Sequence, residues 1–399
     1  MEKSMENPIL HIDMNNFFAS VECLYAPEYR NVPMAVAGEK SNRHGIILAK
    51  NMLAKKAGVK TAETIWQAQK KCPNLALIPP HFERYHEYSQ KAKEIYAHYT
   101  DRVESFGLDE CWLDVGGSKR LFGDSVTIAE EIRKRVKQEL GLTVSIGVSF
   151  TKTFAKLGSD YQKPDAVTVF SRQNYRQLVW NQSVENLLFV GANTKKILNK
   201  YGMQTIGDIA KADFHWMKKI LGKAGESLWL AANGKDSTAV EKIGEEEEVK
   251  TIGNSMTLSR NISKDIEIHE AFLELAEKVS HRLRSHGKRA GEIQITVRSK
   301  DFEEYQRQLL VSPSVCDSQS IYQAALSLYK KENRKWQIRL LGIRAGKLTD
   351  KEEEQISFFE DVKVQKKREE LESAMDKVRE KYGRDALHRA ILMPEEQED

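Results

Sequence analysis

Cysteine is scarce in this chain, and its arrangement offers neither a metal site nor a disulfide framework. The 399 residues include four cysteines, with no CxxC pair and no histidine at zinc-ligand spacing beside one. We therefore expect four reduced thiols, as in a protein of a reducing compartment.

A long apolar run is missing as well. Residues 1–6 do not form a basic start that leads into an apolar segment, and no stretch approaches the roughly 18 apolar residues of a membrane span. We expect a cytoplasmic protein without a membrane partner.

A strong excess of one charge is also absent. The net charge is +4, with 30% charged and 40% hydrophobic residues, which is ordinary for a globular protein. So mild a balance does not by itself indicate nucleic-acid binding, and the placement of the basic residues has to decide. The length allows two to four domains at roughly 100–200 residues each.

What is present is an alternation of strands and helices. Removal of residues 17–80 as an insertion leaves the order strand, helix, strand, strand, helix, strand, which predicts a ferredoxin-like sheet. The expected elements are strands at 9–13, 103–107, 111–115 and 144–148 and helices at 85–99 and 126–140. Inside the insertion we expect a helix from 17 to 25, small strands at 34–37 and 45–48, and a helix at 51–57.

The same βαββαβ order recurs towards the C-terminus. We expect strands at 250–259, 292–298, 305–312 and 336–344 and helices at 266–286 and 318–331, after an acidic linker at 244–248. Between the two patterns, residues 172–240 are predicted to be helical, with a helix, a glycine-bearing turn and a second helix over 190–209. Residues 350–399 are strongly charged and include a long predicted helix at 362–382.

Three carboxylates converge in the first predicted sheet. In a βαββαβ sheet the third strand lies between the first and the second and runs antiparallel to the first. The end of the first strand carries Asp13, so it should meet the start of the third, which carries Asp109 and Glu110.

The residues alone support two interpretations of these carboxylates equally. Three anions this close resist ionisation, and divalent cations remove the conflict. Carboxylate oxygens suit Mg²⁺, and two ions about 3.5–4 Å apart can clamp an in-line phosphoryl displacement. Alternatively, Asp109 and Glu110 form a polar hairpin turn and Asp13 a strand-end cap.

Several motifs that follow one another in a familiar order favour the metal-binding interpretation, because together they resemble a known family. Residues 12–22, 108–114 and 145–149 read IDMNNFFASVE, LDECWLD and SIGVS. With Lys152, Lys156 and Lys163-Pro164, the helical motif and the strand start at 250–253, they resemble the Y-family DNA polymerases in the polymerase IV branch. The resemblance covers about residues 8–350.

The resemblance implies an α+β fold shaped as a right hand. It implies a ferredoxin-like palm at 1–16 and 81–171, small fingers at 17–80, and a helix–hairpin–helix thumb at 172–241. A linker at 242–249 leads to a βαββαβ little finger at 250–349, and a charged tail follows at 350–399.

The resemblance also assigns roles at the site. Asp13, Asp109 and Glu110, with the Met14 carbonyl, would hold two Mg²⁺ ions. Phe18, next to Phe17, would be the steric gate that excludes a 2′-hydroxyl. Lys55 and Lys163 would bind the incoming triphosphate, since a lysine suits phosphate as a compact cation.

Some positions depart from the family pattern. Ala49, Met52 and Lys55 stand where the family usually has Ser or Thr, Tyr and Arg, so one side of the triphosphate pocket lacks two hydroxyls and the bidentate fork. Gly107 replaces a common serine. Asn193 stands where a second glycine is expected in the thumb turn, and we expect it to tolerate a left-handed backbone there.

Contacts to primer–template DNA are expected from two places. In the thumb, backbone N–H groups at Gly191 and the helix start should hold phosphates, with Lys195 and Lys196 nearby. In the little finger, Arg298 belongs to a basic set that would follow a duplex backbone. Its other members are Arg282, Arg284, Lys288, Arg289, Lys300 and Arg307. Plain helix packing and a solvated charged face are the alternatives.

A peptide in the tail resembles a bacterial sliding-clamp ligand. Gln355 is followed by Phe358 and Phe359 in an otherwise charged stretch, although leucine is more usual at the position of Phe358. The alternative is that the two rings fold back onto the body.

The predicted reaction is template-directed addition of dNTPs to a primer 3′-hydroxyl by a monomer, with no proofreading site and with lesion bypass implied by the resemblance. A nucleotidyl cyclase shares the palm and the two-metal carboxylates, but it needs no duplex grip. A non-catalytic DNA- and clamp-binding scaffold is the other alternative, and Met52 and Lys55 motivate it.

Overall fold

The computed structural model describes residues 7–38, 45–245, 248–332, 334–350, 362–383, 386–387 and 389. The chain folds as two compact units, one ending at residue 246 and the other beginning at residue 247. This division falls within the predicted linker at 242–249.

The first unit is built on a five-stranded sheet in the order β5-β6-β1-β7-β8. Its strands are β1 (Ile9–Met14), β5 (Val103–Ser105), β6 (Glu110–Asp114), β7 (Val144–Ser149) and β8 (Val167–Phe170). As predicted, the third strand of the pattern, β6, lies between β5 and β1 and pairs antiparallel with β1. The analysis of the sequence missed β8, which extends the sheet parallel to β7.

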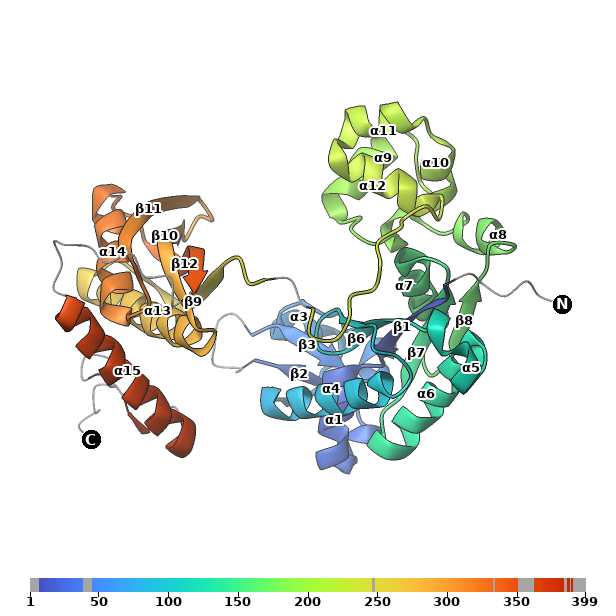
Figure 1. Cartoon of the computed structure of the whole chain (residues 1–399), viewed down its shortest axis with the longest axis horizontal. Coiled ribbons are helices and arrows are strands. Elements are labelled where there is room, and N and C mark those ends of the chain that lie inside the picture. The colour runs from blue at the N-terminus through green and yellow to red at the C-terminus, as the bar shows by residue number, and fades with distance from the viewer. Residues whose placement is uncertain are drawn as a thin grey trace. The chain divides into compact units, whose positions relative to one another are not determined.

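Helices cover both faces of this sheet (Figure 1). Leu10, Ile12 and Met14 alternate along β1 and enter a core shared with α4 (Phe82–Ala97) and α6 (Ser125–Leu140). The intervening side chains of β1 face α7 (Lys152–Tyr161) on the other side, where His11 contacts Ser159.

Two glycines allow α7 to lie directly on the sheet. A Cβ at Gly147 of β7 would stand 1.9 Å from the Ala155 carbonyl oxygen, and a Cβ at Gly158 would stand 2.9 Å from the Gly147 Cα. Only hydrogen fits between these backbones. The close approach fixes Lys156, one residue after Ala155, over the sheet face that carries Asp13 and Glu110.

The insertion between β1 and α4 forms a small sheet of its own, in the order β3-β2-β4. Its elements are α1 (Phe17–Tyr25), η1 (Pro27–Asn31), β2 (Met34–Ala37), β3 (Ile47–Lys50), α2 (Met52–Lys56), α3 (Ile65–Lys71) and β4 (Ala76–Ile78). The Asn51 side chain accepts a hydrogen bond from the Ala54 N–H and so caps α2. The sequence predicted all of these except η1, α3 and β4.

Residues after β8 form the predicted helical piece, seen as a cluster in Figure 1. Its elements are α8 (Tyr175–Val179), η3 (Val184–Asn186), α9 (Ala192–Lys200), α10 (Ile206–Lys211), α11 (Phe214–Leu221) and α12 (Lys223–Ala232). Thr205 and Asp208 form a capping box that starts α10. The expectation for Asn193 was wrong, because it lies inside α9, and Gly202 (φ +78°) makes the left-handed turn between the helices.

The second unit has the predicted βαββαβ order but not the strand arrangement of the first. Its elements are β9 (Ile252–Ile262), α13 (Asp265–Ser285), β10 (Lys288–Ser299), β11 (Glu304–Val315), α14 (Ser318–Glu332) and β12 (Ile338–Asp350). The sheet order is β11-β10-β12-β9. Here the last strand, rather than the third, fills the gap between the first and the second, so every neighbouring pair is antiparallel.

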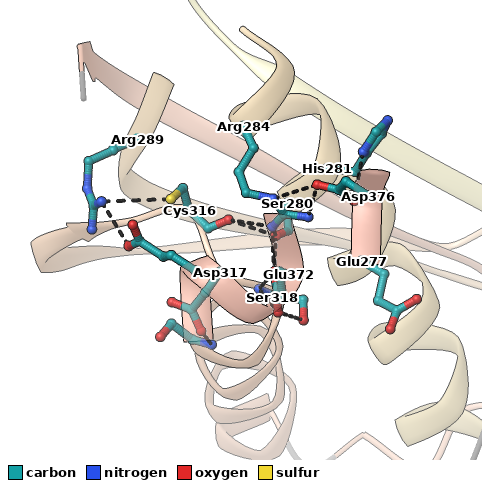
Figure 2. A network of polar contacts seen from close by, with 12 residues as sticks. Glu277, Ser280, His281, Arg284, Arg289, Cys316, Asp317, Ser318, Glu372 and Asp376 are labelled. Atoms are coloured by element: carbon teal, nitrogen blue, oxygen red, sulfur yellow. Dashed lines mark hydrogen bonds and ion pairs between the residues drawn. The ribbon is translucent and has the colours of Figure 1, made fainter. Parts of the chain in front are cut away.

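A last helix, α15 (Val362–Tyr382), is held against α13 and the start of α14 by charge (Figure 2). The Glu372 carboxylate accepts hydrogen bonds from the Ser318 backbone N–H at 3.0 and 3.1 Å and from the Ser280 hydroxyl at 2.9 Å. It also pairs with Arg284, while Glu369 pairs with Arg289. The carboxylate therefore satisfies donors at the N-terminus of α14.

This docking corrects part of the predicted basic DNA face. Arg289 is only 2% exposed, and Arg284 is paired with Glu372 and with Asp376 at 2.7 Å. Two of the arginines predicted to follow a duplex therefore bind α15 instead. The sequence predicted the helix but not its docking, because the carboxylates of α15 and the arginines lie far apart in the chain.

Removal of the Glu372 carboxylate should destabilise the second unit. Glu372→Ala leaves the buried Ser318 N–H without its acceptor and leaves Arg284 with Asp376 as its one remaining acid, which should cost about 1–3 kcal/mol of unfolding free energy. Hydrogen exchange of the α14 amides in the full chain measures this loss. Glu370→Ala, at an exposed position of the same helix, is the matched control, and equal protection in both variants would contradict a stabilising role for the network.

Candidate active site

The predicted carboxylates meet where two interior strands of the five-stranded sheet, β1 and β6, lie side by side. Asp13 is the residue of β1 directly opposite Glu110 of β6. Asp109 stands just before β6, and its carbonyl oxygen accepts a hydrogen bond from the Met14 N–H at 3.0 Å. The antiparallel pairing alone therefore places Asp13, Met14, Asp109 and Glu110 together.

Two lysines neutralise this cluster. The Lys163 ammonium lies 2.6 Å from Asp13 Oδ2 and 2.9 Å from Asp160, and the Lys156 ammonium lies 2.7 Å from Glu110 Oε2 and 3.8 Å from Asp13 Oδ2. The predicted site residue Lys163 is thus brought to the carboxylates. Lys156, which the sequence indicated only as part of a motif, lies between Asp13 and Glu110.

The acids differ in how their surroundings treat a negative charge. Burial raises the pKa of Asp13 to about 6, although the Lys163 ammonium acts in the opposite direction. Burial and the neighbouring Glu110 charge raise the pKa of Asp109. Burial also opposes ionisation of Glu110, but His11 and Lys156 outweigh it and lower the pKa of that carboxyl to about 2.

His11 is a site residue that the sequence analysis missed. It is fully buried on β1, its Nδ1 lies 2.8 Å from the Ser159 hydroxyl of α7, and its Nε2 lies 3.2 Å from Glu110 Oε2. Burial lowers the pKa of His11 to about 4, so the ring is neutral near pH 7. Its position two residues before Asp13 on the same strand face is the signal that could have identified it.

The site offers ligands of the right kind for divalent cations. All its acidic donors are carboxylate oxygens, which hard cations prefer. Glu110 Oε2 is buried, with the Lys156 ammonium at 2.7 Å and His11 Nε2 at 3.2 Å as its partners. No three acidic, histidine or cysteine side chains of the described residues are grouped as a ligand set, and lysines pair with two of the three carboxylates, Asp13 and Glu110. The donors therefore fit a metal site, provided that the ammonium groups move aside.

Phe18, at the start of α1, lies on a layer of aromatic rings. Its ring stacks on Tyr85 with centroids 4.1 Å apart and planes 9° apart, and Phe82 meets it edge-on at 6.0 Å. Phe17 points into the core. The sequence analysis did not identify Tyr85 as a support for Phe18, because Tyr85 belongs to α4, far along the chain.

Tyr85 is anchored by a buried acid. Its hydroxyl donates to Glu22 Oε1 at 2.6 Å, and Arg84 donates to the other oxygen of Glu22 at 2.9 Å. Glu22 is only 2% exposed, so these partners compensate for the burial of its charge. The ring under Phe18 is therefore held in place from α1.

The remaining predicted residues belong to other parts of the chain than β1 and β6. Lys55 is exposed on α2, and Gly191 and Lys196 are exposed at the start of α9. Lys195 pairs with Glu185, and Arg298 pairs with Glu304 at 2.5 Å. Gln355, Phe358 and Phe359 fall outside the described residues. No described helix has the length and apolarity to span a membrane.

Comparison with known proteins places this arrangement in a family. The impB/mucB/samB family profile matches residues 12–160, and the profile of that family's C-terminal domain matches residues 249–358. The first match includes Asp13, Asp109 and Glu110.

Individual relatives match along nearly their whole length. DNA polymerase IV of Acetivibrio thermocellus is 45% identical, over 98% of this chain and 98% of the relative. DNA polymerase IV of Clostridium acetobutylicum is 33% identical, over 98% of this chain and all of the relative.

The fold agrees with a solved structure of the same kind. A Y-family DNA polymerase chimera superposes with a TM-score of 0.76 at 22% identity, covering 86% of this chain and 99% of the chimera. The predicted multidomain α+β polymerase fold is thereby confirmed. With the carboxylates at the sheet edge and full-length relatives of one name, the chain belongs to the Y-family, in its DNA polymerase IV branch, and is a DNA-directed DNA polymerase.

Proposed function

We propose that this polymerase extends a primer 3′-hydroxyl with dNTPs on a DNA template, with two Mg²⁺ ions held by Asp13, Asp109, Glu110 and the Met14 carbonyl. The observation that carries the proposal is the register of β1 against β6, which sets Asp13 opposite Glu110 with Asp109 beside it. The name shared by its full-length relatives supports DNA as substrate and a need for divalent metal.

The side chains around the metal site would have separate roles. When bound, the metal ions supply the activation of the attacking hydroxyl and the stabilisation of the leaving oxygen. Lys156 and Lys163 hold the acids in the arrangement described above, and their release would free two cations for a triphosphate. The neutral His11 orients Glu110 from inside the sheet.

Phe18 would act as the steric gate. A ring that is stacked on Tyr85 and anchored through Glu22 has little freedom to move aside for a 2′-hydroxyl. The discrimination would therefore rest on a rigid surface rather than on a polar contact.

The thumb and the little finger would bind DNA. We assign residues 1–16 and 81–171 to the palm, 17–80 to the fingers, 172–241 to the thumb and 250–349 to the little finger. Gly191, Lys195 and Lys196 would contact primer phosphates at the start of α9, and Arg298 would contact the duplex once it leaves Glu304.

Low fidelity and lesion bypass are proposed from the membership in the DNA polymerase IV branch alone. Ala49 and Met52 offer no hydroxyl, and Lys55 is exposed with a single cationic head. This side of the pocket would therefore hold the triphosphate weakly, whichever base the nucleotide carries. We propose translesion synthesis without proofreading, by a monomer working in the cytoplasm.

A sliding clamp is the proposed protein partner. The proposal rests on the sequence of Gln355, Phe358 and Phe359, which combine a polar anchor with two adjacent large rings. The clamp would keep a weakly held polymerase on its template.

Among the tests of the proposed function, the first is the loss of a carboxylate ligand. Asp109→Ala should lower the rate of primer extension by about 10³-fold or more, since one ligand of a catalytic metal supplies several kcal/mol. Single-turnover extension with Mg²⁺ measures the rate. Asp101→Asn, at a side chain 75% exposed, serves as control. An inactive wild-type chain at every Mg²⁺ concentration would favour the non-catalytic scaffold.

The second prediction concerns sugar selection. Phe18→Ala should reduce the preference for dNTPs over rNTPs by roughly 10²-fold, because the ring that meets the 2′-hydroxyl is gone. The ratio of kcat/KM values for the two sugars gives the measure. Trp66→Ala removes a ring of α3 that is 69% exposed and does not belong to the aromatic layer at Phe18, so it should leave the ratio nearly unchanged. Unchanged selection in Phe18→Ala would refute the gate.

The third prediction concerns the tail. Joint substitution of Gln355, Phe358 and Phe359 by Ala should abolish stimulation of synthesis by the clamp, while distributive extension stays at the wild-type rate. Processivity assays with and without clamp separate the two activities. Alanine at residues 352–354, the adjacent acidic run, is the matched control. Equal loss of both activities would show that the peptide supports the fold instead.

A further inference from the structure

Phe189 is displayed at the surface in an unfavourable backbone conformation. It lies between η3 and α9, its side chain is 80% exposed, and its φ is +68°. Left-handed φ is a genuine outlier for a bulky residue. The described chain provides no aromatic or cationic partner for this ring. No such contact within the described residues therefore accounts for the exposed ring, and backbone outliers of this kind gather at functional positions.

The neighbours of Phe189 fix the direction of its ring. Leu187 and Val190 enter the core of the helical piece. Leu188 packs against a buried cluster that includes Ile9 and Trp112, which lie on the strands that carry Asp13 and Glu110. Both chain neighbours of Phe189 are therefore packed, and one of them ties this segment to the sheet of the carboxylates.

An open cavity connects Phe189 with the candidate active site. Its volume is about 340 Å³, and Lys156 and Asp160 line it on the α7 side, while Phe189 and Gly191 line it at the start of α9. Lys156 also touches Glu110. A strand whose 3′ end lies at the carboxylates could therefore leave through this space, with its phosphates at the N-terminus of α9 and its sugars and base edges against the ring.

We propose that Phe189 is a positioning residue for the primer strand: its ring packs against a primer nucleotide next to the one whose phosphate lies at the start of α9. The proposal rests on the polymerase function proposed above. The contact is apolar, so it adds affinity and alignment without neutralising a phosphate. Its contribution should therefore be independent of salt, unlike that of Lys196.

Four variants of the full chain separate the ring from the backbone. Phe189→Ala and Phe189→Gly both lack the ring, and only glycine adopts the left-handed φ freely. Phe189→Tyr keeps an aromatic ring. Leu121→Ala is the matched control, because Leu121 in α5 (Lys119–Phe122) is 81% exposed and lies outside the proposed path.

The measurement is the Kd of a fluorescent primer–template at several salt concentrations, by anisotropy and without dNTP. We expect a roughly tenfold rise in Kd for both ring-less variants, with an unchanged slope of log Kd against log salt. The Tyr and Leu121 variants should bind as the wild type does. Phe189→Gly should also raise Tm by about 2–4 °C, because it relieves the backbone.

Several outcomes would overturn the proposal. Wild-type affinity in Phe189→Ala would show that the ring touches nothing. Full affinity in Phe189→Gly beside weak binding in Phe189→Ala would assign the effect to the backbone. A changed salt slope would point to lost phosphate contacts. If the wild-type chain itself fails to bind primer–template, the polymerase proposal fails instead, and the two failures are thus distinct.

Discussion

The pairing of β1 with β6 is the constraint on which the site depends. One register sets Asp13 opposite Glu110 and leaves Asp109 hydrogen-bonded through its carbonyl to Met14. A shift by a single residue would turn Asp13 into the apolar core and Ile12 out of it, because side chains alternate along a strand. The hydrophobic core thus protects the geometry of the carboxylates.

On the sheet face that α7 covers, opposite the apolar core, positive side chains offset the repulsion between the carboxylates. Gly147 and Gly158 let α7 lie against β7 with no side chain between them, and this brings Lys156 to Glu110. Ser159 of the same helix holds His11, which is neutral and lies beside the same carboxylate. The close packing of α7 on β7 therefore determines which side chains lie beside Glu110. The pKa values of Asp13 and Glu110 differ because burial dominates at Asp13, whereas the His11 hydrogen bond and the Lys156 ammonium outweigh burial at Glu110.

Buried acids also organise two regions beyond the carboxylates. Glu22 joins α1 to α4 and fixes the ring beneath Phe18, and Glu372 joins α15 to the start of α14. In both cases one carboxylate accepts hydrogen bonds from groups that burial would otherwise leave unsatisfied. The last domain is consequently completed by a helix outside the residues matched by the two family profiles.

The sequence by itself determined the βαββαβ order, the convergence of Asp13 with Asp109 and Glu110, and the family, because alternation and motif order are local properties of the chain. Only the tertiary structure decided which residues surround these acids. His11, Lys156 and Tyr85 reach the site from other elements, and no local pattern encodes such contacts. The same holds for the strand order of the second sheet, for Arg289 buried against Glu369, and for Asn193, whose place in α9 rather than in the turn depends on how the helical piece packs.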